Sequence, residues 1–259
     1  MNDEELDYEF LNIEGIYALL DGDYKKAEEL FTKAIKIEDN SFESLCNMGK
    51  LLLVQGKVDE ALEFFEKSLE KNPEYPEALH NVGVSYYRKQ ELEKAISYYM
   101  KAVEIDDKYF ESWFNLGNSF YEKGELQEAL KYYKKTTEAN PNFTDAYYNL
   151  GNVYRELGQH TLAKKAYQDI LKIRQDDAAV YYNLGYVLQI TNDLDGAIEN
   201  YQQAIKLREN YLKAILNLGI AYQAKNNFGK ALMYFEKALK IQPDLQIVQE
   251  RIVQIKEKE

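Results

Sequence analysis

Asparagine side chains recur along this sequence at a fixed interval and are the first candidates for chemistry. Six of them stand 34 residues apart, and they are Asn47, Asn81, Asn115, Asn149, Asn183 and Asn217. A primary amide offers hydrogen-bond donors and an acceptor, so it can pair with both backbone groups of an extended peptide. A row of such amides along one surface would therefore hold a peptide by its main chain. The same amides could instead be solvated polar groups without a ligand.

Acidic residues recur at the same interval, four residues before the asparagine position. In five successive units this position holds Glu9, Glu43, Glu77, Glu111 and Asp145. A stripe of acids would favour a basic peptide, because complementary charge steers association and selects partners. An acid in the first turn of a helix also stabilises the helix dipole, which would explain each residue without a ligand. The sequence leaves both explanations open.

Aromatic residues and further amides border the asparagine row. In four successive units the residue before the asparagine is His80, Phe114, Tyr148 or Tyr182. Aromatic anchors usually dominate interface energies, whereas packing between neighbouring units would explain these rings equally well. We predict a peptide-binding surface formed by Asn47, Asn81, Asn115, Asn118, Asn149, Asn152, Asn183, Asn217, Glu77, Glu111, Asp145, Phe114, Tyr148 and Tyr182.

Residue patterns for catalysis or metal binding are not evident. His80 and His160 are the two histidines and Cys46 is the one cysteine, and together they have no metal-ligand spacing. The glycines fall within helices and turns rather than after strands, so no phosphate-binding loop is predicted. We therefore predict no metal, no cofactor and no enzymatic activity. The thiol of Cys46 is expected to be small and partly buried, and it cannot form an internal disulfide.

The charge of the chain restricts its partners. The formal net charge is −12 and the sequence pI is about 4.9. Such a field repels phosphate backbones and anionic lipid, so nucleic acid and membranes are poor candidates, while a basic protein would be attracted. The acidic start of the chain differs from a secretory leader, and no run of eighteen apolar residues is present. We expect a cytoplasmic protein.

An internal repeat of 34 residues sets these positions. It is seen first in the glycines Gly15, Gly49, Gly83, Gly117, Gly151, Gly185 and Gly219. An alanine stands twelve residues after each glycine and an aromatic residue four residues further, in all seven copies and without insertion or deletion. Repetition at this period indicates stacked supersecondary units. If each unit starts seven residues before its glycine, the seven repeats span 8–41, 42–75, 76–109, 110–143, 144–177, 178–211 and 212–245.

Each repeat is predicted to contain two helices. Repeat positions 4, 7, 8 and 11 carry apolar or small residues, which is a helical spacing. Repeat position 15 holds glycine or asparagine except at Gln90, and these two residues tolerate the left-handed conformation that ends a helix. Glycine inside a helix costs about 1 kcal/mol relative to alanine. We therefore expect the second helix, with its alanine and aromatic residue, to approach each of the seven glycines closely.

The repeat resembles the tetratricopeptide repeat (TPR) family, whose signature places Trp, Leu, Gly, Tyr, Ala, Phe, Ala and Pro at fixed positions. The fourth repeat matches best, with Trp113, Leu116, Gly117, Phe120, Ala129, Tyr133 and Pro141. The resemblance implies an all-α, right-handed superhelix, or α-solenoid, whose first helices line a concave groove. The asparagine row is similar to that in the TPR superhelix of O-linked N-acetylglucosamine transferases. It differs from the carboxylate clamp of chaperone-binding TPRs, because repeat position 6 never holds arginine.

The two ends of the array depart from the repeat. Residues 1–7 form an acidic lead, and Glu14 occupies a position that is apolar in the later repeats, which suits a cap. Residues 246–259 are expected to form a C-terminal capping helix. Its apolar stripe would consist of Leu245, Val248, Ile252 and Ile255.

Three functions remain open on the sequence alone. The first is a non-enzymatic scaffold or adaptor that binds an extended peptide segment of a partner protein in the groove. The second is a structural protein that assembles with itself or with a complex through its convex face or its terminal helix. The third is the targeting subunit of an enzyme whose catalytic part lies on another chain.

Overall fold

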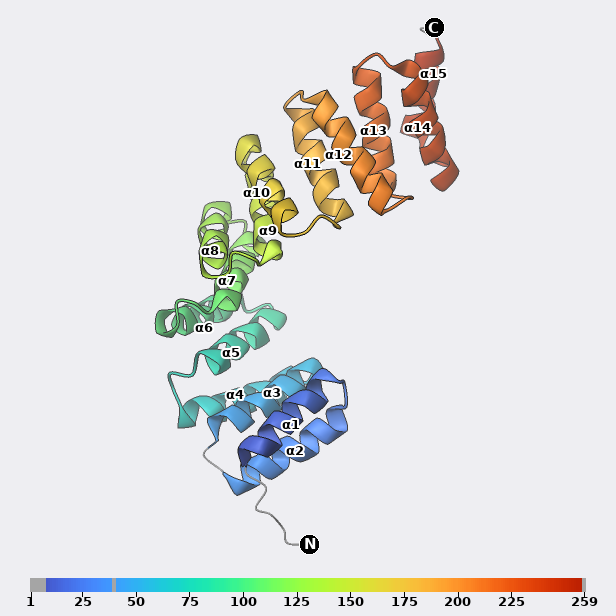
Figure 1. Ribbon diagram of the computed structural model, residues 1–259. Helices are drawn as coiled ribbons and strands as arrows, with labels where there is room; N and C mark the ends of the chain where they lie inside the picture. Colours follow the sequence, from blue (N-terminus) through green and yellow to red (C-terminus); the bar gives the residue numbers. More distant parts are fainter. Residues whose placement is uncertain (1–7, 39–40, 258–259) are drawn as a thin grey trace. The chain divides into compact units, whose positions relative to one another are not determined.

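The computed structural model describes residues 8–38 and 41–257, in which α-helices are joined by short turns (Figure 1). The described residues form fifteen helices and no strand, which confirms the all-α prediction. The helices are α1 (Tyr8–Leu20), α2 (Tyr24–Ile37), α3 (Phe42–Val54), α4 (Val58–Lys71), α5 (Pro76–Arg88), α6 (Leu92–Ile105), α7 (Phe110–Glu122), α8 (Leu126–Ala139), α9 (Thr144–Glu156), α10 (His160–Ile173), α11 (Ala178–Ile190), α12 (Leu194–Leu207), α13 (Leu212–Ala224), α14 (Phe228–Ile241) and α15 (Gln246–Lys256). The predicted acidic lead, residues 1–7, lies outside the described residues.

The chain divides into two compact units, Met1–Asn140 and Pro141–Glu259. Helices α1–α8 belong to the first unit and α9–α15 to the second. From α1 to α14, each odd-numbered helix packs on the even-numbered helix that follows it. Within a unit, each of these even-numbered helices also contacts the first helix of the next repeat, so the core is built from contacts between neighbours. Among the described helices, none combines the length and apolar character that crossing a bilayer requires.

The glycine at repeat position 8 is the point of closest approach between the two helices of every repeat. A Cβ atom placed on Gly117 would lie 2.5 Å from ring carbons of Tyr133, and one placed on Gly219 would lie 2.7 Å from the ring of Phe235. The same contact joins Gly15 to Phe31, Gly49 to Phe65, Gly83 to Tyr99, Gly151 to Tyr167 and Gly185 to Tyr201. All seven rings are fully buried. The expected close approach is thus confirmed, and it is the aromatic ring that occupies the space left by the glycine.

Replacing Gly219 by alanine is expected to destabilise the second unit by about 1–2 kcal/mol. The added methyl group would overlap the buried ring of Phe235, and overpacking of this kind costs about 1–3 kcal/mol. The gain in helix propensity offsets at most about 1 kcal/mol of that cost. Urea unfolding followed by circular dichroism would measure the difference.

The matched control lies in the same repeat. A Cβ atom placed on Gly229 in α14 would meet no heavy atom within 4 Å beyond the backbone around it, and the φ angle of this residue is not left-handed. Gly229→Ala should therefore be neutral or stabilising by up to about 1 kcal/mol. Equal destabilisation by both substitutions would contradict the close-packing explanation.

The turn inside each repeat is closed by one residue with a positive φ angle. This residue is Gly22, Gly56, Gln90, Gly124, Gly158, Asn192 or Asn226. Gln90, the exception in the sequence, adopts φ 62° and so has the same left-handed conformation as the glycines. Its turn also has the same hydrogen bonds, since Gln90 N donates to Tyr87 O at 2.9 Å and Glu91 N to Tyr86 O at 3.0 Å. The packing of the two helices therefore outweighs the unfavourable residue type at this position.

Helix α15 packs on α14 after the seventh repeat. Val248 and Ile255 are buried, whereas Ile247 and Val253 are exposed. Ile252 is half-buried. The helix begins at Gln246, as expected for the C-terminal segment, and residues 258 and 259 of that segment lie outside the described residues.

Candidate functional site

The asparagines at repeat position 6 are not equally accessible. Asn47 in the first unit and Asn183 in the second are each only 6% exposed. The other four, Asn81, Asn115, Asn149 and Asn217, are half-buried. We refer to the surface that carries repeat positions 2, 5, 6 and 9 of the odd-numbered helices as the first-helix face. A peptide on this face could reach the four half-buried amides more readily than the two buried ones.

The position-6 amides link consecutive repeats. Asn47 Nδ2 donates to Asn12 Oδ1 at 3.0 Å, and Asn183 Nδ2 donates to the hydroxyl of Tyr148 at 2.9 Å. In the following repeat, Asn217 Nδ2 donates to the Tyr182 hydroxyl at 3.4 Å. Each of these acceptors stands at position 5 of the preceding repeat. In these three pairs the amide has a structural role between repeats.

Asn81 differs from these amides because most of its bonding is local. Its Nδ2 donates to the Glu77 carbonyl oxygen at 2.8 Å and lies 4.0 Å from Cys46 Sγ. Cys46 is fully buried, so the prediction of a partly buried thiol was wrong. The thiol lies where the second and third repeats pack together, and burial raises its pKa, which leaves it as an unreactive core residue.

The tyrosines at position 5 of the second unit pack on one side and remain partly accessible. The ring of Tyr148 meets that of Tyr167 with centroids 6.2 Å apart, and the ring of Tyr182 meets that of Tyr211 at 5.3 Å. Both Tyr148 and Tyr182 are half-buried. In the first unit, Phe114 packs on Tyr133 at 5.9 Å and is half-buried as well. These ring contacts lie within single repeats, and not between neighbouring repeats as the packing explanation from the sequence supposed. A role of the three rings in binding stays a prediction.

Asn118 and Asn152 accept hydrogen bonds from the hydroxyl groups of buried tyrosines. The hydroxyl of Tyr133 donates to Asn118 Oδ1, and that of Tyr167 donates to Asn152 Oδ1, each at 2.8 Å. The sequence contains a signal for this pairing. Asparagine at position 9 occurs only in the fourth and fifth repeats, and each of these repeats has a tyrosine at position 24. The structure thus gives the two amides a structural role, and their role in ligand binding stays a prediction.

Glu77 is paired within the first unit rather than available as an isolated acid. Its carboxylate accepts from Lys50 Nζ at 2.7 Å and from the Tyr75 hydroxyl at 2.6 Å. Burial alone would raise the pKa of Glu77, but the bonds from Lys50 and Tyr75 outweigh it and hold that pKa below its usual value. Lys50 was not predicted as a site residue, and it largely cancels the negative charge at this point.

His80 is a core residue. Its Nδ1 lies 2.8 Å from Ser112 Oγ, and its ring contacts those of Tyr99 and Tyr109 at centroid distances of 5.5 and 5.1 Å. Burial lowers the pKa of His80 to about 4, so the imidazole is neutral at physiological pH. The side chain therefore contributes to packing between repeats and not to the first-helix face.

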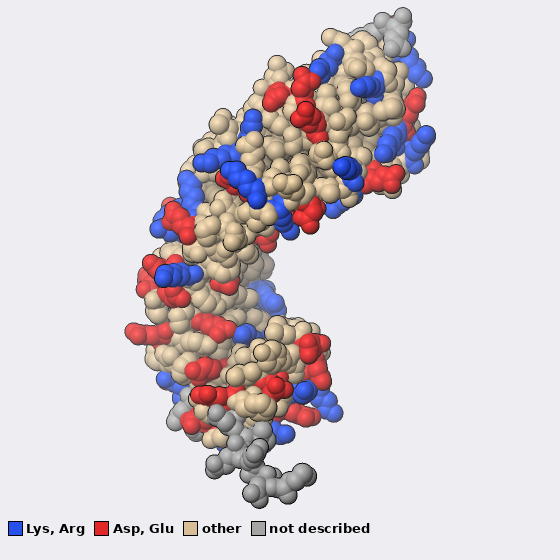
Figure 2. Space-filling view, in the orientation of Figure 1, with Lys and Arg blue, Asp and Glu red and all other residues tan. Residues whose placement is uncertain are grey.

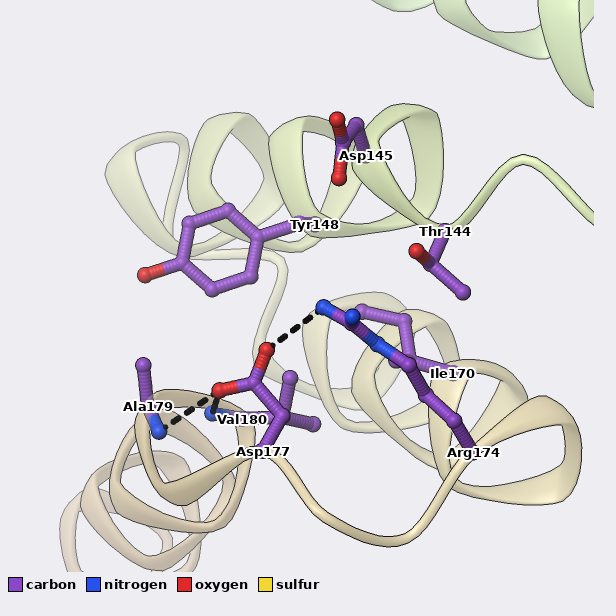
Figure 3. A pocket seen from close by; sticks show the side chains of 8 residues that line it. All are labelled: Thr144, Asp145, Tyr148, Ile170, Arg174, Asp177, Ala179 and Val180. Carbon is purple, nitrogen blue, oxygen red and sulfur yellow. Dashed lines mark hydrogen bonds and ion pairs between the residues drawn. The ribbon is translucent and has the colours of Figure 1, made fainter.

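Asp145 lines a pocket of about 200 Å³ in the second unit (Figure 3). Asp145, Thr144 and Tyr148 come from α9, and Ile170 from α10. The opposite wall is the segment around the start of α11, and its lining residues are Arg174, Asp177, Ala179 and Val180. Two of the lining residues, Asp145 and Tyr148, stand at positions 2 and 5 of the fifth repeat and so belong to the first-helix face.

The charged groups in this pocket have different partners. Asp177 caps α11, because its Oδ1 accepts from the backbone nitrogens of Ala179 at 2.8 Å and Val180 at 3.3 Å. Its other carboxylate oxygen pairs with Arg174 Nη2 at 2.7 Å. Asp145 is exposed and forms no ion pair with the described residues. With two carboxylates and one guanidinium, the pocket carries a net negative charge.

The remaining acid of the prediction, Glu111, is exposed at the start of α7. Elsewhere on the visible face of each unit, acidic and basic side chains are interspersed (Figure 2). The net charge of −12 is therefore not concentrated in one patch on that face. Within residues 8–38 and 41–257, no group of three or more His, Cys, Asp or Glu side chains is placed to hold a metal ion.

Comparison with known proteins places these features in a family. A family model described as Tetratricopeptide repeat matches residues 40–108, 143–210 and 176–244, and one described as TPR repeat matches residues 117–158. No curated protein matches the sequence at a significant level.

Several solved structures have the same fold. The crystal structure of YrrB, a TPR protein with an unusual peptide-binding site, is 28% identical, with a TM-score of 0.66 over 72% of this chain and 96% of YrrB. The crystal structure of MamA is 27% identical, with a TM-score of 0.62 over 65% of this chain and 92% of MamA. The C-terminal part of a TPR repeat-containing protein from Cytophaga hutchinsonii shares the fold at 18% identity, with a TM-score of 0.76 over 92% of this chain and 98% of that protein.

Seven helix pairs in the described residues repeat one glycine–aromatic contact, and the family model covers more than half of the chain. This chain therefore belongs to the tetratricopeptide repeat family.

Proposed function

We propose that this chain binds an extended, basic segment of a partner protein along the first-helix face of its second unit. Its TPR fold supports a role as a protein–protein interaction scaffold in general. The observation that carries the more specific proposal is the pocket beside Asp145, Tyr148 and Asp177. The similarity to YrrB, a TPR protein with a peptide-binding site, lends further support.

The pocket suits the side chain of a lysine or arginine. Asp145 offers an exposed carboxylate, and the ring of Tyr148 forms an adjoining wall (Figure 3). A cation over an aromatic ring at an exposed site contributes about 0.5–1 kcal/mol, and an exposed ion pair contributes about 0.2–1 kcal/mol. Together these contacts would distinguish a basic from a neutral side chain by about tenfold in affinity.

The position-6 amides of the second unit would hold the peptide main chain beside the pocket. Because Asn217 Nδ2 is directed to Tyr182, the geometry leaves its Oδ1 to accept from a peptide N–H group. Each such bond is worth about 0.5–1.5 kcal/mol, so a few in series are needed for useful affinity.

The proposal predicts that Asp145→Asn weakens binding of basic peptides by about two- to fivefold, the value of one exposed ion pair. Fluorescence anisotropy with short unstructured peptides of graded charge would measure it. Asp176→Asn is the matched control, because it removes the same charge from an exposed residue that does not line the pocket. Neutral peptides should bind both variants as they bind the parent protein.

The outcome of this experiment decides between the candidate surfaces. If Asp145→Asn and Asp176→Asn lower the affinity for basic peptides equally, the loss comes from the overall charge of the protein, and the pocket is not the binding site. In the same assay, Asn217→Ala should lower the affinity for all peptides regardless of their charge, by up to about tenfold. Failure of the parent protein to bind any peptide would rule out peptide binding on this face.

A further inference from the structure

Helix α1 exposes a continuous apolar stripe. Four of its large apolar side chains are accessible: Phe10 is 53% exposed, Ile13 51%, Tyr17 59% and Leu20 77%. Their spacing of three, four and three residues puts them within about 80° of one another around the helix axis. Apolar surface gathered in this way is typical of an interaction site, whereas single exposed apolar residues are not.

Two of the four stripe positions are buried in the later repeats. Phe10 and Tyr17 occupy repeat positions 3 and 10. In the second, third, fourth, sixth and seventh repeats these positions hold small or aliphatic residues that are almost fully buried: Ser44, Leu51, Ala78, Ser85, Ser112, Ser119, Val180, Val187, Ala214 and Ala221. There the first helix is covered by the second helix of the preceding repeat. At Phe10 and Tyr17, helix α1 thus presents, with larger side chains, positions on which a neighbouring helix normally packs. Leu20 extends the stripe at position 13, which is exposed in the later repeats as well.

The charges around the stripe indicate what kind of helix fits it. Glu9 lies on one side of the stripe and Glu14 on the other, and α1 contains no lysine or arginine. A second copy of α1 would bring like charges together without compensation. Helix α15 is also a poor complement, because its exposed Ile247 and Val253 are six residues apart and lie on different sides of that helix. Charge complementarity favours an apolar stripe flanked by basic residues.

We propose that α1 is the docking site for an amphipathic, basic helix of a partner protein. The partner helix would lay apolar residues at i, i+3, i+4 and i+7 on the stripe and place lysine or arginine beside Glu9 and Glu14. This site is separate from the pocket at Asp145, so the two can be tested independently. Glu9 and Ile13 stand at positions 2 and 6, so the stripe borders the part of the first-helix face that lies on α1, whereas the extended segment is assigned to the second unit.

A synthetic amphipathic helix with leucines at the apolar positions and lysine and arginine on both flanks is the probe, and the same peptide with glutamate flanks is its control. We expect the full chain to bind the basic helix at least tenfold more tightly, measured by fluorescence anisotropy. A variant carrying Ile13→Ser, Tyr17→Ser and Leu20→Ser should lose that binding at least tenfold while its melting temperature stays close to that of the parent, since all three side chains are exposed. Asp145→Asn should bind the helix as the parent does.

Three results would overturn the proposal. The first is that the chain binds the basic and the glutamate-flanked helix equally well, or binds neither. The second is that the serine variant still binds the basic helix as tightly as the parent does. The third is a dimer in sedimentation equilibrium that the serine substitutions dissociate, which would assign the stripe to a second copy of the chain. A further variant, Glu9→Lys with Glu14→Lys, should reverse the preference toward the glutamate-flanked helix, and an unchanged preference would count against the proposed flanking contacts.

Discussion

Replacing Tyr167 by alanine is expected to reduce the free energy of unfolding of the second unit by about 3–5 kcal/mol, as is usual for a buried aromatic ring. The ring is fully buried and fills the space over Gly151, where a Cβ atom would lie 2.5 Å away. Its hydroxyl also donates to Asn152 Oδ1 at 2.8 Å. Truncation therefore opens a cavity between α9 and α10 and removes the partner of a half-buried amide.

Two further variants separate these contributions. Tyr167→Phe keeps the ring and removes only the hydrogen bond, so it should cost about 0.5–1.5 kcal/mol. Met233→Ala removes a large side chain that is exposed in the same unit, and it should change stability by no more than about 0.5 kcal/mol. Urea unfolding gives the overall loss, and hydrogen exchange should show it concentrated in α9 and α10. A similar loss in the Tyr167→Ala and Met233→Ala variants would show that the glycine–aromatic contact does not hold the repeat together.

The second large effect concerns pH and His80. Because burial lowers the pKa of His80 to about 4 in the folded chain, the unfolded chain binds a proton more readily below its ordinary pKa of 6.5. Above pH 6.5 His80 does not change the free energy of unfolding. As the pH falls from 6.5 to 4, protonation of His80 in the unfolded chain lowers that free energy. The total contribution over that window is roughly 3 kcal/mol. We therefore expect the first unit to unfold more readily in mild acid than its carboxylates alone would cause.

A His80→Gln variant isolates this contribution. Glutamine retains a polar group near Ser112 but does not titrate, so its free energy of unfolding should fall less steeply with acidification than that of the parent. Urea unfolding at a series of pH values would measure the free energy of unfolding of both proteins. The value for the parent minus the value for the variant should decrease by roughly 3 kcal/mol between pH 7 and pH 4. Parallel curves for the two proteins would mean that His80 is protonated in the folded state without penalty.

Much of the fold could be predicted because the determinants are local and repeated seven times. The glycine at position 8, the aromatic residue at position 24 and the turn residue at position 15 each act within one helix pair, and their period fixes where that pair begins. Gln90 could not be placed with the same certainty, because its own preference opposes the left-handed conformation that packing imposes. Residue type sets a local tendency, whereas the contact between two helices decides the outcome.

The candidate site was predicted less completely because its residues have partners in neighbouring repeats. The sequence placed Asn183 and Tyr148 on the same surface, but their mutual hydrogen bond depends on how the fifth and sixth repeats pack. Arg174 was missed because its repeat position is always polar but varies in charge, and Asp177 because its position is usually aromatic. An aspartate just before a helix is nevertheless a recognised capping signal. The exposed stripe of α1 was not predicted, because the exposure of these apolar residues depends on which helices pack around α1 and not on the residue types alone.

The bond from position 6 to position 5 of the preceding repeat has a consequence for how such an array evolves. Asn12, Tyr148 and Tyr182 each carry an oxygen that accepts this bond, so a repeat depends on which neighbour comes before it. A repeat copied into the place after the fourth repeat would meet Phe114 at position 5, which has no acceptor oxygen. A repeat copied into the place after the fifth would meet Tyr148, which has one. The repeats are therefore not interchangeable modules, and their order along the chain is itself under physical constraint.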